Sequence, residues 1–240
     1  MTAIRTHALV KRYKDIIAVD KLDLEIFKGE LFSLLGVNGA GKTTTIKMLS
    51  CLSSPSSGEA SVGGYSITKE PKRVKELIGV SPQETAVAPN LSVKENLELI
   101  CGIQGFSREK TALKVNELIC RFGLEEVSRR KAGKLSGGWQ RRVSIAMALI
   151  GEPQILFMDE PTLGLDVIAR HDLWDLIRSL KGKITIILTT HYLEEAEALS
   201  DRIGIMKNGA LLAVGTAEEL KLHAGTHDFE TAFVTLVKER

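Results

Sequence analysis

The sequence has little of several features that mark particular classes of protein. Its three cysteines, Cys51, Cys101 and Cys120, form no CxxC pair, so we expect small buried or partly buried thiols in a reducing cytosol. The formal net charge is only +2, which indicates no electrostatic preference for nucleic acid. The longest apolar runs, such as residues 184–188, are far shorter than the roughly 20 residues that span a bilayer. Residues 1–13 also lack the apolar core of a secretory signal.

The residues that are present have the composition of an ordinary soluble domain, with 44% hydrophobic and 26% charged side chains. Three continuous apolar runs, at residues 31–35, 155–158 and 184–189, are typical of strands in a parallel sheet that is covered on both faces. Residues 22–26 and, less clearly, 59–62 alternate between apolar and polar side chains. This alternation predicts strands with one face in water.

Helical stretches lie between the predicted strands. Residues 43–52 and 136–150 predict two of them, and in the second the apolar residues share one face while Arg141 and Arg142 lie off it. Residues 84–133 contain no strand-like run and several helical ones. We therefore predict that residues 84–133 form an inserted, mostly helical subdomain.

A glycine-rich segment follows the first apolar run. Residues 36–43, GVNGAGKT, match the P-loop pattern G-x-x-x-x-G-K-[ST]. Glycines admit the required backbone angles and leave room for a phosphate among converging N–H groups, and a helix starting near Lys42 presents its positive dipole end. Lys42 would contact the β- and γ-phosphates of a nucleotide, and the Thr43 hydroxyl would ligate Mg²⁺. The residues predicted to bind ATP here are Gly36, Val37, Asn38, Gly39, Ala40, Gly41, Lys42, Thr43 and Thr44.

The P-loop pattern has a simpler alternative, a plain glycine-rich turn. It also leaves the kinase, GTPase, helicase and transporter ATPase classes open. Other parts of the chain must therefore decide between them.

Two acids end the second apolar run. Asp159 and Glu160 fall at the carboxyl end of a predicted parallel strand, where ligands bind in open α/β sheets. Asp159 would hold Mg²⁺, and Glu160 would polarise the attacking water. Because adjacent carboxylates near phosphates repel each other, we expect the site to need the metal. The alternative is a strand that ends in solvated acids.

A second segment with a hydroxyl and bare N–H groups opens the helix predicted over residues 136–150. Ser136, Gly137 and Gly138 would form another anion site at a helix N-terminus. The alternative is a simple N-cap. A chain that already has a P-loop needs a second phosphate cradle if two copies meet head to tail, so that each closes the other's nucleotide site.

With this segment, LSGGW at residues 135–139, the chain resembles the ATP-binding subunit of ABC transporters over nearly its whole length. Most members have LSGGQ, and Trp139 stands where glutamine is usual. The resemblance implies an α/β fold: a P-loop NTPase core with a mixed, mainly parallel sheet, an antiparallel β subdomain and an inserted α-helical subdomain. It also implies a homodimer or heterodimer of ATP-binding subunits.

The resemblance assigns roles to four further residues. His191, just past the third apolar run, matches the switch histidine that contacts the γ-phosphate; a surface or structural histidine is the alternative. Gln83 matches the glutamine that approaches Mg²⁺ and the attacking water, and the expected catalytic residues are therefore Lys42, Gln83, Glu160 and His191. Tyr13 resembles the aromatic that stacks on adenine, or is an ordinary strand-edge tyrosine. Asp166 matches the aspartate that reaches across the dimer, while Leu163 replaces the serine usual in that loop.

The expected organisation is one ABC ATP-binding domain over residues 1–225, followed by a short helical tail at 223–240. The core of this domain would comprise residues 1–83 and 134–222, and the helical subdomain about 84–133. The resemblance implies a transmembrane permease on a separate chain, which would hold the protein peripherally on the cytoplasmic side of the cell membrane.

The expected function is hydrolysis of ATP, with Mg²⁺, to drive a substrate through that permease. Two stretches resemble the ABC-2 exporter branch, which favours export. The first rival is a non-transport ABC-type ATPase acting as a mechanochemical or regulatory factor; the single cassette and the low net charge disfavour it. A non-hydrolysing module and a P-loop kinase are disfavoured by the intact site residues and by the LSGG segment.

Overall fold

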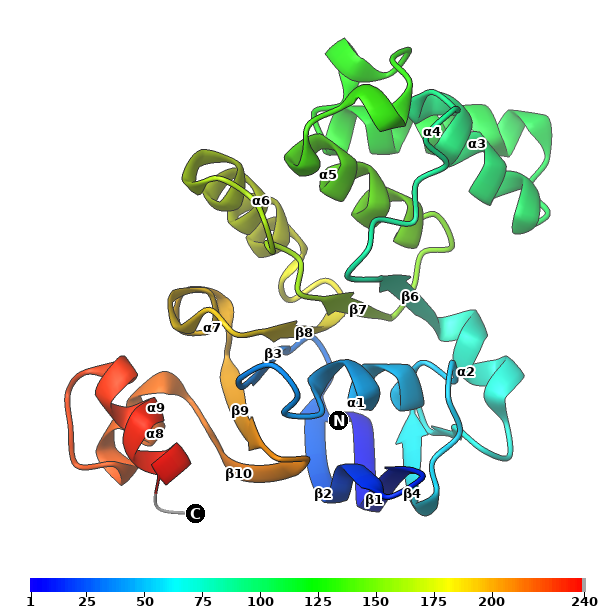
Figure 1. The fold of residues 1–240 in the computed structure, drawn as a ribbon. Coiled ribbons are helices and arrows are strands. Elements are labelled where there is room, and N and C mark those ends of the chain that lie inside the picture. The colour runs from blue at the N-terminus through cyan, green and yellow to red at the C-terminus, as the bar shows by residue number, and fades with distance from the viewer. Residues whose placement is uncertain (239–240) are drawn as a thin grey trace.

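The computed structural model describes residues 1–238 of the chain, and the last two residues of the expected tail lie outside the described residues. The expected α/β fold is confirmed. Two sheets form the lower part of the molecule in Figure 1, and a group of helices that includes α3, α4 and α5 stands above one edge of the larger sheet. Among residues 1–238 we find no helix with the length and apolar character needed to cross a membrane.

The larger sheet has six strands, and five of them run parallel. The sixth strand, β10, pairs antiparallel with β9 at one edge. In spatial order the strands are β10 (Ala210–Gly215), β9 (Arg202–Lys207), β3 (Leu31–Leu35), β8 (Thr185–Thr190), β7 (Ile155–Asp159) and β6 (Ile78–Ser81). The sheet is therefore mixed and mainly parallel, as expected.

The continuous apolar runs arise because this sheet is covered on both faces. Along β7, Leu156 and Met158 enter a core shared with the helices of the upper group. Ile155 and Phe157 point to the other face and enter a second core, which the larger sheet shares with the smaller sheet. Successive side chains of a strand alternate between faces, so most positions in such a strand are apolar.

The smaller sheet is antiparallel, and its first two strands form a long hairpin. In spatial order its strands are β2 (Ile16–Phe27), β1 (Thr2–Tyr13), β4 (Ser57–Val62) and β5 (Tyr65–Ser66). The strands expected at residues 22–26 and 59–62 lie within β2 and β4. Tyr13 is the last residue of β1, where the hairpin turns.

The helices pack against the two sheets and form the upper group. They are α1 (Lys42–Leu49), α2 (Pro71–Leu77), α3 (Val93–Ile103), α4 (Arg108–Arg121), α5 (Gly137–Ala148), α6 (Val167–Leu180), α7 (Leu193–Leu199), α8 (Ala217–His223) and α9 (Phe229–Lys238), with short 3₁₀ turns at Glu125–Val127 and Ala132–Lys134. Residues 84–133 contain α3 and α4 and no strand. The exact subdomain boundaries stay a prediction.

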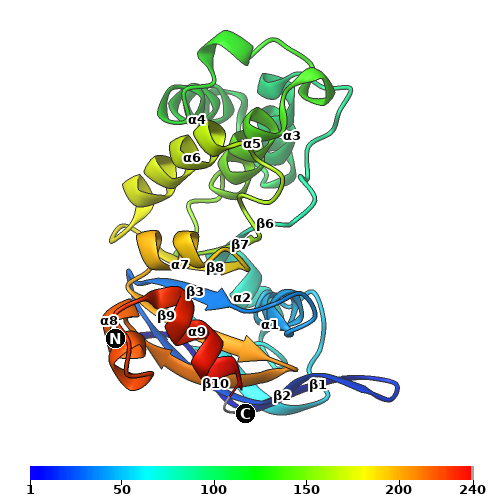
Figure 2. The same cartoon turned by 60° about the vertical axis from the view of Figure 1, so that its left-hand side comes forward.

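The C-terminal helices rest on the antiparallel edge of the larger sheet. Helix α9 lies against β9 and β10 (Figure 2), and its buried residues Phe229 and Leu236 belong to a third core there, with Ile203 and Ile205 of β9. The Thr216 hydroxyl accepts from the backbone N–H of Glu219, and the Glu219 side chain accepts from the N–H of Thr216, which closes a capping box at the start of α8.

Arg141 lies off the apolar face of α5 by sequence pattern and is nevertheless only 4% exposed, because α5 is covered by other elements on more than one side. One expectation from the sequence is wrong. Cys120 is exposed rather than buried or partly buried, while Cys101 and Cys51 fit the expectation.

Candidate active site

Parallel strands bring the predicted site residues to one edge of the larger sheet. Strand β3 ends at Leu35, β7 at Asp159 and β8 at Thr190, and Asp159 lies opposite Thr189 while Leu35 lies opposite Thr190. Residues separated by more than 100 positions in the chain thereby become neighbours. The site is built at the carboxyl ends of the strands, as ligand sites in such sheets are.

The loop between β3 and α1 needs its glycines for packing as well as for conformation. Gly41 has φ +102°, and a Cβ on it would lie 2.4 Å from the carbonyl oxygen of Ala18 in β2. A Cβ on Gly36 would lie 2.4 Å from the carbonyl oxygen of Met206 in β9. Both contacts are shorter than real Cβ atoms show, so neighbouring strands hold this loop in its shape.

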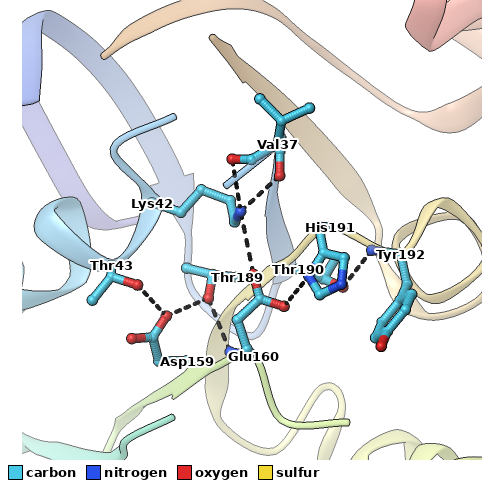
Figure 3. Close-up of polar contacts among 10 residues, drawn as sticks. Val37, Lys42, Thr43, Asp159, Glu160, Thr189, Thr190, His191 and Tyr192 are labelled. Carbon is cyan, nitrogen blue, oxygen red and sulfur yellow. Dashed lines mark hydrogen bonds and ion pairs between the residues drawn. The ribbon is translucent and has the colours of Figure 1, made fainter. Parts of the chain in front are cut away.

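Lys42 reaches back over the loop from the first turn of α1 (Figure 3). Its Nζ donates to the carbonyl oxygen of Gly36 at 2.6 Å and to that of Val37 at 3.3 Å. The same nitrogen lies 3.2 Å from Glu160 Oε1, and both side chains are almost fully buried. The ammonium group is therefore held at the loop by two carbonyls and one carboxylate.

Asp159 is oriented by two hydroxyl groups from different elements. Thr43 Oγ1 donates to Asp159 Oδ1 at 2.9 Å, and Thr189 Oγ1 donates to the same oxygen at 2.6 Å. Thr189 was not among the predicted site residues. Its place at the end of the third apolar run, two residues before His191, is the one signal in the sequence that could have indicated it.

Glu160 joins the P-loop to the end of β8. Its backbone N–H donates to Thr189 Oγ1 at 3.0 Å, and its Oε2 lies 2.7 Å from His191 Nδ1. Glu160 has φ +49°, in the left-handed region that few residues other than glycine adopt. Such strain persists where surrounding contacts overdetermine the conformation, which is common at functional sites.

The adjacent carboxylates of Asp159 and Glu160 are stabilised by contacts within the chain and not by a metal ion alone. Glu160 is paired with Lys42, and Asp159 accepts two hydroxyl donors. A carboxylate accepts hydrogen bonds, so the contact with Glu160 places the proton of a neutral His191 ring on Nδ1 and leaves Nε2 for another partner.

These residues border a cavity of about 510 Å³, within the range of ligand sites. Most of the predicted site residues line this cavity, together with Ala18 and Leu163. The predicted residues in its lining are Tyr13, Asn38, Gly39, Ala40, Gly41, Lys42, Thr43, Thr44, Gln83, Glu160 and His191. Gly36, Val37 and Asp159 adjoin these residues without forming part of the lining. A larger cavity, of about 650 Å³, lies at the other end of the strands and contains none of the predicted residues.

The second helix start lies outside this cavity. Ser136 and Gly137 are exposed, Gly138 is half-buried, and the Ser136 hydroxyl makes no hydrogen bond that caps α5. Asp166 also lies outside the cavity, where its carboxylate caps α6 by accepting from the N–H of Ala169 at 2.9 Å. The chain therefore does not bring these four residues to its own P-loop.

Trp139 is a packing residue. Its ring packs against the core of the upper helices, and the Arg142 guanidinium lies 5.0 Å from the ring centre. The amide of Gln140, one position later, donates to the carbonyl oxygen of Leu135 at 3.0 Å. The fifth position of the LSGGW segment is thus taken up by contacts within the chain.

A buried carboxyl group follows His191 by four residues in the chain. Glu195 of α7 is fully buried and its Oε1 accepts from Trp174 Nε1 at 3.1 Å. Burial raises the pKa of this carboxyl group, although the hydroxyls of Thr190 and Thr162 and the Trp174 N–H oppose the shift. The sequence pattern gave no reason to single out Glu195.

The oxygen atoms present fit Mg²⁺ bound together with phosphates. Among residues 1–238 there is no cluster of three or more His, Cys, Asp or Glu side chains that could hold a metal ion. Mg²⁺ in nucleotide sites is usually bound through one or two carboxylates, with substrate phosphates and several waters completing its shell. Thr43 Oγ1 and Asp159 Oδ1 lie 2.9 Å apart, and both Thr43 and Gln83 border the cavity.

Comparison with known proteins identifies the family of this chain. Residues 19–163 match the family model described as ABC transporter. The chain belongs to the ABC transporter family. It is an ATP-binding subunit of this family and an ATPase.

Two relatives and one solved structure illustrate the similarity of this ABC protein. It is 42% identical over 225 residues to daunorubicin resistance ATP-binding protein DrrA3 of Streptomyces coeruleorubidus, covering 93% of this chain and 71% of the relative. It is 44% identical over 211 residues to doxorubicin resistance ATP-binding protein DrrA of Mycobacterium tuberculosis, covering 88% of this chain and 64% of the relative. A dimeric ATP-binding cassette in a post-hydrolysis state, bound to ADP and Pi, has a TM-score of 0.80 and 27% identity, covering 89% of this chain and 98% of that one.

Proposed function

We propose that this ABC subunit hydrolyses Mg²⁺-ATP at an interface between two ATP-binding subunits and drives export through a permease on a separate chain. The observation that carries the proposal is the arrangement of Lys42, Glu160 and His191 beside the P-loop cavity. The names of the two relatives, which refer to drug resistance, support export.

The dimer is supported by the place of the second helix start. Ser136 and Gly137 are exposed and lie outside the P-loop cavity of their own chain. Free N–H groups at a helix N-terminus attract anions, so a second protomer can use this segment to close its nucleotide site. The dimeric state of the structurally similar cassette supports the same assembly.

Lys42 would act by exchanging partners, whereas His191 would act by holding Glu160 and contacting the nucleotide at the same time. Phosphate oxygens can replace the carbonyls and the carboxylate that hold Lys42, which places a buried positive charge where negative charge develops. His191 keeps Glu160 in place through Nδ1 and directs Nε2 to the nucleotide. Phosphoryl transfer depends mainly on such positioning and charge stabilisation.

Glu160 would accept the proton of the attacking water or orient it. A positioned general base contributes about 10²- to 10⁴-fold to a rate, which corresponds to roughly 3–5 kcal/mol of the barrier. When bound, Mg²⁺ would be held by Thr43, Asp159 and Gln83 and would offset phosphate charge.

A permease contact is supported by apolar side chains on α3. Leu99 is 44% exposed and Ile103, one turn later, is 72% exposed. Apolar residues grouped on an exposed helix face are typical of interaction sites. With the permease in the cell membrane, this ABC subunit would lie peripherally on the cytoplasmic side.

The test is a pair of substitutions in the purified chain. Glu160→Gln should keep ATP binding, lower turnover by about 10²- to 10⁴-fold, and accumulate an ATP-bound dimer on a sizing column. Ser136→Arg should stop turnover while the monomer still binds ATP, because it alters only the partner's site.

Glu194→Gln is the matched control, since Glu194 is an exposed carboxylate on the surface of α7. It should turn over at the rate of the unaltered chain. Turnover of Glu160→Gln near that rate would remove Glu160 from its role. Loss of monomer binding in Ser136→Arg would assign Ser136 to the nucleotide site of its own chain.

A further inference from the structure

Two side chains in α5 hold the loop that carries Gln83. Arg141 Nη1 donates to the carbonyl oxygen of Pro82, and Arg141 Nη2 donates to that of Gln83, both at 2.6 Å. Gln140, the preceding residue, accepts from the Thr85 hydroxyl at 3.3 Å. Three hydrogen bonds thus join the first turns of α5 to a loop more than 50 residues earlier in the chain.

The Arg141 guanidinium is a buried cation whose direct hydrogen bonds go to backbone carbonyls. Burial lowers its pKa, and the charges of Asp159 and Glu195 act in the opposite direction. An arginine stays protonated under such conditions. Because its planar fork fits two carbonyl oxygens at once, Arg141 fixes both the distance and the direction between α5 and residues 82–83.

The two ends of this connection belong to different nucleotide sites of the proposed dimer. Gln83 borders the cavity of its own chain, whereas residues 136–138 would serve the cavity of the partner. Arg141 follows Ser136 by five positions on one helix. A close-packed interior transmits strain, so a shift of the Gln83 loop would also shift the 136–138 segment.

We propose that Arg141 is a positioning residue that couples the two nucleotide sites by tying the Gln83 loop to the 136–138 segment. The proposal rests on the proposed function. ATP that draws in Gln83 in one site then sets the position of the 136–138 segment against the other, so that the second ATP binds to a prepared site. The result is positive cooperativity carried through a contiguous pair of hydrogen bonds.

The experiment measures ATPase rate against ATP concentration for the purified full chain, together with ATP binding to the monomer. Arg141→Met should reduce the Hill coefficient from about 2, the number of sites, towards 1. Monomer ATP binding should stay within about twofold, because Arg141 touches only backbone outside the P-loop. Arg141→Lys should restore part of the cooperativity, since an ammonium group can reach one of the two carbonyls.

Arg142→Met is the matched control. Arg142 is the neighbouring arginine and pairs with Asp172 at 2.9 Å and with Trp139, so its loss should lower stability without removing cooperativity. If Arg141→Met fails to fold, Gln140→Leu, which removes the Thr85 contact, should lower the Hill coefficient to a smaller degree.

Unchanged cooperativity in Arg141→Met, or an equal loss in Arg142→Met, would overturn the coupling role. Loss of monomer ATP binding in Arg141→Met would also overturn it, because Arg141 would then build the site of its own chain. Turnover that survives Ser136→Arg would instead overturn the proposed function on which the coupling rests.

Discussion

Replacing Thr189 by valine tests whether a single buried hydroxyl orients Asp159. Thr189 Oγ1 is fully buried, donates to Asp159 Oδ1 at 2.6 Å and accepts from the N–H of Glu160 at 3.0 Å. Valine has nearly the same shape and removes only the hydroxyl. The Glu160 N–H keeps its second acceptor, the Thr189 carbonyl oxygen at 3.1 Å, so the main loss is the bond to the carboxylate.

The size of the effect follows from that bond. Hydrogen bonds to charged groups contribute about 1.5–3 kcal/mol, so Thr189→Val should lower the free energy of unfolding by about 2 kcal/mol. Loss of a group that orients a metal ligand typically weakens metal use by about 10- to 100-fold, which is about 1.4–2.8 kcal/mol.

Two assays measure these effects, and Thr185→Val controls for them. Urea unfolding gives the stability, and ATPase rate against Mg²⁺ concentration gives the metal dependence. Thr185 lies on the same strand, is 3% exposed, and its hydroxyl accepts from the N–H of Gly29 at 3.0 Å. Its loss should cost about 0.5–1.5 kcal/mol and leave the Mg²⁺ dependence unchanged. Equal Mg²⁺ dependence in the two variants would refute the role of Thr189.

Two further predictions concern Glu195 and Leu99. Burial raises the pKa of Glu195, so its contribution to stability is greatest below the unfolded pKa and falls as the pH rises. Glu195→Gln, measured by urea unfolding, should therefore match the unaltered chain at about pH 4 and exceed it by the order of 1 kcal/mol at about pH 8; a gain that shrinks with rising pH would contradict this. Leu99→Asp should keep ATPase activity but lower co-purification with membranes that contain the permease, whereas Leu113→Asp on α4 should not; an undiminished membrane fraction would remove Leu99 from the contact.

The sequence by itself determined the local parts of this ABC subunit. Continuous apolar runs, such as Leu31–Leu35, identify buried parallel strands because both faces of each strand are covered. The GVNGAGKT and LSGGW segments identify the family. In these cases the required residue types lie next to one another in the chain, so a pattern can reveal them.

Only the tertiary structure decided how these parts meet. Strand β3 lies between β8 and β9, although both follow it by more than 150 residues, and this order brings Lys42 and His191 to opposite oxygens of Glu160. The burial of Arg141 depends on the elements packed around α5, and the spacing of apolar residues along the helix does not indicate these elements. Such contacts join residues far apart in the chain, and their geometry exists only after the sheet has formed.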